Sequence, residues 1–225
     1  MTRLREFHCK NWICSSVQKL IALIGRCPIL QHLAVDVSHN MLQQSTVLAN
    51  TLAQLTSLTA LEFRSFYDGV IPDLTEGDIF LASTYISHLL NHLGSQETSH
   101  IRTLSFGADR EPLLLSNSMI KAAASISSTR TIQLYNDYFY DEYLEYAILD
   151  DNEGIRHDVN GHTPQITSQG MTNFLSMLQR NTQIEIIHFK DIKNLSTEAY
   201  KVLGRMCTLR ELYISDCSTI SKTKI

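Results

Sequence analysis

The stretch Leu209-Arg210-Glu211-Leu212-Tyr213-Ile214-Ser215-Asp216-Cys217 decides the fold of this 225-residue chain. Apolar residues occupy its first, fourth and sixth positions, and a cysteine closes it. The alternation around Leu212 and Ile214 is typical of a strand with one buried face, because successive side chains in a strand point to opposite faces. The same frame recurs upstream in looser form, so the chain is built from repeats.

Seven copies of the frame share a central apolar residue, and these residues are Phe7, Leu33, Leu61, Leu104, Ile132, Ile187 and Leu212. The steps between them are 26, 28, 43, 28, 55 and 25 residues. Most of these steps fall in the range of about 20–29 residues that leucine-rich repeats show. The two long steps exceed a step of about 27 by roughly 15 and 28 residues, which predicts loops or lengthened helices there.

Each apolar strand is followed by an amphipathic stretch. Apolar residues spaced by three and four between Val17 and Ile24 predict a helix, which Gly25 and Pro28 end. Similar patterns predict helices near residues 41–55, 73–94, 116–127, 171–178 and 196–206.

One strand-plus-helix unit cannot bury its apolar face alone, so successive units stack. The sequence therefore predicts an α/β fold, a right-handed leucine-rich-repeat solenoid of about seven repeats. Its curved parallel sheet carries the helices on the convex side. We expect a single domain over residues 1–225. We also expect it to be part of a longer array, because neither end shows the polar cap that solenoids need.

Two copies of the repeat carry cysteine at matching points. The stretches Cys27-Pro28-Ile29-Leu30-Gln31-His32-Leu33 and 207–221 resemble the cysteine-containing leucine-rich repeat of F-box proteins, which is ribonuclease-inhibitor-like. The resemblance implies a non-enzymatic protein-interaction module. It further implies the substrate-recognition part of an SCF-type ubiquitin ligase receptor. An SCF adaptor would bind through an F-box segment that this chain lacks, so no adaptor-binding residues are assigned.

The concave face of such a solenoid is the expected partner site, because curvature makes it an extended binding surface. Side chains that flank the two inward apolar positions of each strand point toward this face. The residues expected to bind a protein partner there are Glu6, His8, Lys10, His32, Asp36, Glu62, Arg64, Gln133, Tyr135, His188, Lys190, Glu211 and Tyr213. Tyr135 and Tyr213 are the expected anchors, since tyrosine gives a large contact area at low entropic cost.

A second candidate surface is an acidic, tyrosine-rich insertion loop at residues 136–163. Between residues 136 and 160, eight acidic residues stand against one basic residue, Arg156, which gives −7 and leaves +3 for the rest of the chain. Such a loop could contact a basic partner, or it could be a solvated excursion without a partner. The residues expected to make the contact are Tyr138, Tyr140, Asp141 and Tyr143.

Composition excludes several function classes. The net charge of −4 gives no basic excess, so we expect no nucleic-acid partner. No apolar run approaches the roughly 18 residues of a membrane span, and residues 1–8 lack the apolar core that we expect of a signal peptide. The five cysteines show no short-range pairing, so we expect small buried residues in a reducing compartment, the cytoplasm or nucleus.

Other readings stay open with less support. A regulator of an enzyme, an inhibitor or a GTPase activator, would use Arg64 or Arg110 after a strand. A hydrolase would need a nucleophile that no motif indicates. A zinc site of His8, Cys9 and Cys14 has no known ligand spacing, and His88 with His92 lacks a third ligand. The sequence therefore predicts no metal and no cofactor.

Overall fold

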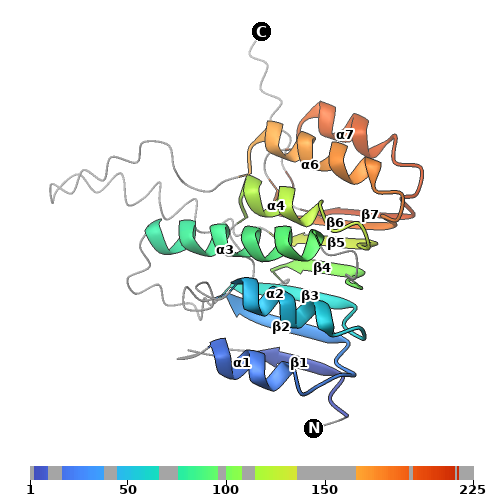
Figure 1. Cartoon of the computed structure of the whole chain (residues 1–225). Helices are drawn as coiled ribbons and strands as arrows, with labels where there is room; N and C mark the ends of the chain where they lie inside the picture. The colour runs from blue at the N-terminus through green and yellow to red at the C-terminus, as the bar shows by residue number, and fades with distance from the viewer. Residues whose placement is uncertain are drawn as a thin grey trace, which may run out of the picture.

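The computed structural model describes residues 3–9, 17–37, 45–65, 76–95, 100–107, 115–135, 166–192, 195–215 and 217. These residues contain seven strands, which form one parallel sheet in sequence order (Figure 1). The strands are β1 (Glu6–Cys9), β2 (His32–Val37), β3 (Ala60–Ser65), β4 (Thr103–Phe106), β5 (Thr131–Tyr135), β6 (Ile186–Lys190) and β7 (Glu211–Ser215).

The helices lie between the strands in sequence and together on one side of the sheet (Figure 1). They are α1 (Val17–Ile24), α2 (Ser45–Gln54), α3 (Glu76–Gly94), α4 (Asn117–Ala123), α6 (Ser168–Arg180) and α7 (Thr197–Leu203). The predicted α/β repeat solenoid is thereby confirmed. Helix α3 has 19 residues, so a lengthened helix accounts for part of the long step between β3 and β4.

The strands pair in the register of the sequence frame. Phe7 lies opposite Leu33, and Leu33 lies opposite Leu61. The same register continues through Leu104, Ile132, Ile187 and Leu212. Residues at the same position of the frame therefore form a continuous row across the sheet. The register of one strand pair predicts which residues lie opposite each other in the next pair.

One core lies between the sheet and the helices, and its buried residues run from Leu20 to Met206. The two inward apolar residues of every strand from β2 to β6 are at most 4% exposed. The rings of Phe63 and Phe106 stack between adjacent coils with centroids 5.7 Å apart. Each such buried side chain stabilises the fold by about 1.5–3 kcal/mol through burial of apolar area.

Polar side chains hold the helical side together. Ser116, Thr167 and Ser196 cap α4, α6 and α7, because each side-chain oxygen accepts from a backbone N–H in the first turn. Asn117 then links α4 to α6. Its Nδ2 donates to Thr167 Oγ1 at 3.1 Å, and its Oδ1 accepts from the Thr167 backbone N–H at 3.1 Å. These contacts cap three helices and fix the start of α4 against the start of α6.

The cysteines follow the prediction only in part. Cys9 and Cys27 are buried, as expected, but Cys207 is exposed and Cys217 is half-buried. Cys207 lies in the turn before β7, the last described strand, and no further described coil packs over that turn. Cys14 lies outside the described residues. No helix in the described ranges combines the length and apolar character needed to cross a lipid bilayer.

Candidate functional site

The face of the sheet turned away from the helices, which we call the open face, is the candidate site. No described helix packs against it (Figure 1). The strand register arranges its side chains in rows. The middle row consists of His8, Ala34, Glu62, Ser105, Gln133, His188 and Tyr213. Residues that the sequence predicts to share a row therefore lie side by side on the sheet.

The first row adds Glu6 and His32 at its N-terminal end, and Glu211 at its C-terminal end. The third row brings together Tyr135 and Lys190, which lie opposite each other. Whether these residues bind a partner stays a prediction. Two small residues of the middle row, Ala34 and Ser105, are buried, so the exposed surface is made by their longer neighbours.

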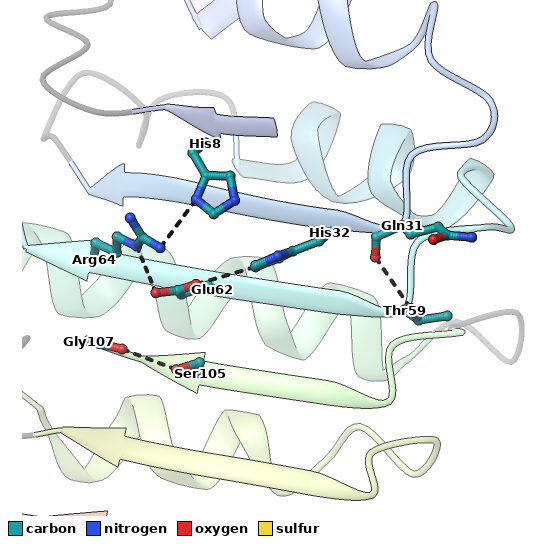
Figure 2. A network of polar contacts seen from close by, with 8 residues as sticks. All are labelled: His8, Gln31, His32, Thr59, Glu62, Arg64, Ser105 and Gly107. Carbon is teal, nitrogen blue, oxygen red and sulfur yellow. Dashed lines mark hydrogen bonds and ion pairs between the residues drawn. The ribbon is translucent and has the colours of Figure 1, made fainter. Parts of the chain in front are cut away.

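Four residues from β1, β2 and β3 form a polar network at the N-terminal end of the open face (Figure 2). Arg64 Nε donates to Glu62 Oε1 at 2.7 Å, and Arg64 Nη2 lies 3.3 Å from His8 Nδ1. His32 Nε2 lies 3.3 Å from Glu62 Oε2. The Arg64 and Glu62 side chains are only 12% and 13% exposed, so this pair is largely covered.

Glu62 is the centre of this network. Burial alone would raise the pKa of its carboxyl, but hydrogen bonds from His32 and Arg64 and the charges of both outweigh burial and lower the pKa to about 2. Glu62 therefore carries its negative charge at physiological pH. A buried charge paired in this way costs little, because both carboxylate oxygens accept hydrogen bonds from cationic or polar groups.

Two members of this network, His8 and His32, also lie close to Glu6, and the three residues are potential metal ligands. Glu6, His8 and His32 each offer one ligand atom, and these atoms all lie within 4.8 Å of one another. The rings of His8 and His32 meet edge to face, with centroids 5.0 Å apart. The sequence does not predict this group because the ligands come from two different repeats. The strand register was the signal that could have joined them, since Glu6 lies opposite His32.

The C-terminal end of the open face is aromatic and more exposed. Tyr213 is 54% exposed, and its ring lies edge to face against the His188 ring at a centroid distance of 4.2 Å. The Tyr213 hydroxyl donates to Glu211 Oε2 at 3.2 Å. This hydrogen bond and the Glu211 charge raise the pKa of Tyr213. Desolvation lowers the pKa of His188, and the Glu211 charge opposes that effect only in part.

Several predicted residues do not fit the roles given to them. Arg64 lies within β3, not on a loop after it, and its guanidinium is held by Glu62 and His8. The zinc set of His8, Cys9 and Cys14 is wrong, because His8 is exposed while its strand neighbour Cys9 is buried on the other face. His92 Nε2 lies 2.8 Å from Asn50 Oδ1, whereas His88 is exposed.

The remaining predicted residues are described only in part or lie outside the described residues. Lys10, Arg110 and the acidic insertion with Tyr138, Tyr140, Asp141 and Tyr143 lie outside the described residues. Asp36 belongs to β2, and its backbone lies opposite that of Arg64, but its side chain is not described. The open face is therefore defined by its described rows alone.

Comparison with known proteins adds a fold neighbour and no family. No protein-family model matches the chain, and no curated protein matches it in sequence. Among solved structures, the chain is similar to the tropomodulin C-terminal domain from Caenorhabditis elegans. The TM-score is 0.46 at 10% sequence identity, and the match covers 86% of this chain and 93% of that one. This likeness is too weak to transfer any function.

Proposed function

We propose that this chain is a non-enzymatic protein-interaction module whose partner binds the open face of the sheet. One observation carries the proposal: the strands present their outward side chains in continuous rows on a face that no described helix covers. Parallel solenoids use such a surface to contact a partner over many repeats. A protein partner suits the mixed character of the rows, which combine charged, amide and tyrosine side chains.

The C-terminal end of this face is the proposed anchor. Interface hot spots favour tyrosine, and Tyr213 is more than half exposed beside His188. Tyr135 on β5 lies two strands away, opposite Lys190 on β6. A partner that covers Tyr135, His188 and Tyr213 would bury aromatic area at the centre and leave charged side chains such as Lys190 at the rim.

A photo-crosslinking amino acid placed at single positions tests the proposal. Tyr213 and Tyr135 are the test positions, and Tyr200 on α7 is the matched control, because it is a 36%-exposed tyrosine on the helical side. We expect a crosslinked protein adduct from positions 135 and 213 and none from position 200. The crosslinked partner is then purified, and its dissociation constant is measured by titration calorimetry.

In that titration we expect Tyr213→Ala to weaken binding about tenfold or more, which is the size of a typical hot-spot effect. Tyr200→Ala should leave the dissociation constant unchanged. If adducts form only at Tyr200, or if the two substitutions weaken binding equally, the partner does not bind through the open face of the sheet.

The more specific proposal is substrate recognition within an F-box-type SCF ubiquitin ligase, in the cytoplasm or nucleus. It is supported by the cysteine-containing repeat. Cys217 Sγ accepts from the Ile192 backbone N–H at 3.4 Å, so this cysteine ties the turn after β6 to the chain after β7. Co-purification of the full-length gene product with an adaptor and a cullin tests this setting. If neither is recovered, the ligase setting falls and the binding-module proposal remains.

The regulator of an enzyme is the weaker alternative. A GTPase-activating arginine has to reach the transferred phosphoryl group from a loop. Arg64 instead lies in β3 and is hydrogen-bonded to Glu62 and His8. Stimulated GTP turnover that disappears in Arg64→Ala or Arg110→Ala would restore this alternative.

A further inference from the structure

We propose that Glu6, His8 and His32 form a zinc-binding site on the open face, where β1 meets β2. Two imidazoles and one carboxylate are a ligand set that Zn²⁺ accepts, and three protein ligands leave a further coordination position. That position would face outward from the sheet, open to water or to a side chain of a bound protein. The site is separate from the proposed tyrosine anchor at β5–β7.

The strand backbone brings the ligands together. Glu6 and His8 lie two residues apart on β1, so both point to the open face. Glu6 is also the register partner of His32 on β2. The ligand atoms lie within 4.8 Å of one another, whereas bonds of about 2.0–2.1 Å in a tetrahedral site require a closer approach. Glu6 and His8 are exposed, so their side chains have room to move toward an ion.

The carboxylate of Glu62 orients the His32 ligand. Glu62 Oε2 lies 3.3 Å from His32 Nε2, which places the proton of a neutral His32 on Nε2 and leaves Nδ1 as the lone-pair nitrogen. Metal-bound histidines commonly donate their other N–H to a carboxylate in this way. Arg64 in turn holds Glu62 through a 2.7 Å hydrogen bond, so the partner of His32 is itself fixed.

Arg64 also competes with the ion. Its Nη2 lies within hydrogen-bond distance of His8 Nδ1, so a neutral His8 accepts at Nδ1 and carries its proton on Nε2. Zinc can bind Nδ1 only by displacing the guanidinium. It can bind Nε2 only if the proton moves to Nδ1, where Arg64 offers a second donor. Either way the Arg64–His8 hydrogen bond has to break. A substitution that removes this hydrogen bond should therefore strengthen zinc binding.

The test is a zinc titration of the full chain without a histidine tag, followed by calorimetry. We expect one zinc ion per chain with a dissociation constant tighter than about 100 µM. Glu6→Gln, His8→Asn and His32→Gln should each weaken binding at least about tenfold. Glu62→Gln should weaken it by about 10–100-fold as a loss of the carboxylate partner. Arg64→Gln removes the guanidinium from His8 but keeps an amide that can donate to Glu62, so it should tighten binding by roughly threefold to tenfold, the value of one hydrogen bond.

Three variants serve as matched controls and should bind zinc like the original chain. His188→Asn removes another open-face histidine, His88→Gln removes an exposed helical histidine, and Cys207→Ser removes an exposed thiol. Circular dichroism without zinc checks that every variant keeps its fold. In the original chain, zinc should raise the unfolding temperature because it binds only the folded state.

Two results would overturn the proposal. One is the lack of any binding tighter than about 100 µM in the folded chain. The other is binding that survives all three ligand substitutions, or that disappears in a control variant. Co²⁺ gives an independent readout, because its visible absorption reports the ligand set. A cobalt spectrum that is unchanged by His8→Asn and His32→Gln would also exclude the site.

Discussion

The inner repeats and the last described repeat share the same sequence frame, but they bury its apolar residues to different degrees. Ile187 in β6 and Leu212 in β7 hold the same position and lie opposite each other in the sheet. Ile187 is fully buried, whereas Leu212 is 42% exposed. The sequence frame therefore determines the face of the sheet to which a side chain points. The neighbouring repeats determine how much of that side chain is buried. The first two predictions that follow compare an inner residue with a matched residue of the last described repeat.

The largest expected difference concerns these two residues. Ile187→Ala should lower the free energy of unfolding by about 2–5 kcal/mol, because it leaves a cavity among packed coils. Leu212→Ala removes a side chain that is already partly hydrated, so it should cost about 1 kcal/mol or less. Urea denaturation followed by circular dichroism measures both. Equal costs would mean that Leu212 is covered in solution and that the contrast between the coils is wrong.

Two glycines give the next comparison. Gly94 ends α3, and a Cβ there would lie 3.1 Å from the Ser125 backbone oxygen and closer still to the Ser125 hydroxyl. Gly94→Ala should therefore cost about 1–3 kcal/mol, as overpacking does. Gly204 follows α7 with φ −64°, and its Cβ would meet Tyr200 O only at 3.5 Å. Gly204→Ala should stabilise the chain by about 0.4–1 kcal/mol. Thermal unfolding of both variants distinguishes the signs, and a loss at Gly204 would contradict the prediction.

The asparagine that joins α4 to α6 should have a smaller effect. Asn117→Ala removes two hydrogen bonds to Thr167 and should lower the free energy of unfolding by about 1 kcal/mol. Asn173 is the control, because it is exposed and its Oδ1 accepts a hydrogen bond from Gln169 of its own helix. Asn173→Ala should change stability by less than about 0.5 kcal/mol. If the two variants unfold at the same denaturant concentration, the link between the helices contributes nothing.

The smallest effect expected is a pH response at His188, beside the last strand. Desolvation lowers its pKa in the folded chain, so the unfolded chain binds more protons between that pKa and about 6.5. The contribution of His188 to stability is therefore complete above about pH 6.5 and decreases as the pH falls through its folded pKa. An NMR titration of the His188 ring protons should give a midpoint below 6.5.

Two variants sharpen that titration. Tyr213→Ala exposes the imidazole and should move the midpoint up toward 6.5, because the Tyr213 ring lies 4.2 Å from it. Glu211→Gln removes the charge that favours protonation and should move the midpoint further down. A midpoint that neither substitution shifts would show that the end of the sheet does not shield His188.

The fold could be predicted from the sequence because the frame and its steps specify repeated local units. The central apolar residues, four of whose six steps are 25–28 residues, gave the strand positions, and stacking of similar units gave the parallel register. Burial of Cys207 was predicted wrongly for the same reason that Leu212 is exposed. The motif of Cys207 matches that of Cys27, but no described coil follows it.

The candidate site could be predicted only as a set of positions. Strand alternation placed His8, His32 and Glu62 on one face, which the register confirms. Which side chains meet depends on rotamers and on contacts across two strands, such as that between Arg64 and His8, 56 residues apart. The pKa of about 2 at Glu62 depends on those contacts, so no local pattern could supply it.

The 55-residue step between Ile132 and Ile187 bears on how the chain folds. Pairing β5 with β6 requires closing a connection about twice as long as the 28-residue step between Leu104 and Ile132. Loop-closure entropy rises only with the logarithm of length, so a doubling costs about 0.6 kcal/mol. The two coils beyond the long step can therefore join the growing sheet with little delay. A nearest-neighbour array of this kind tolerates long inserted segments because each strand recognises the edge before it.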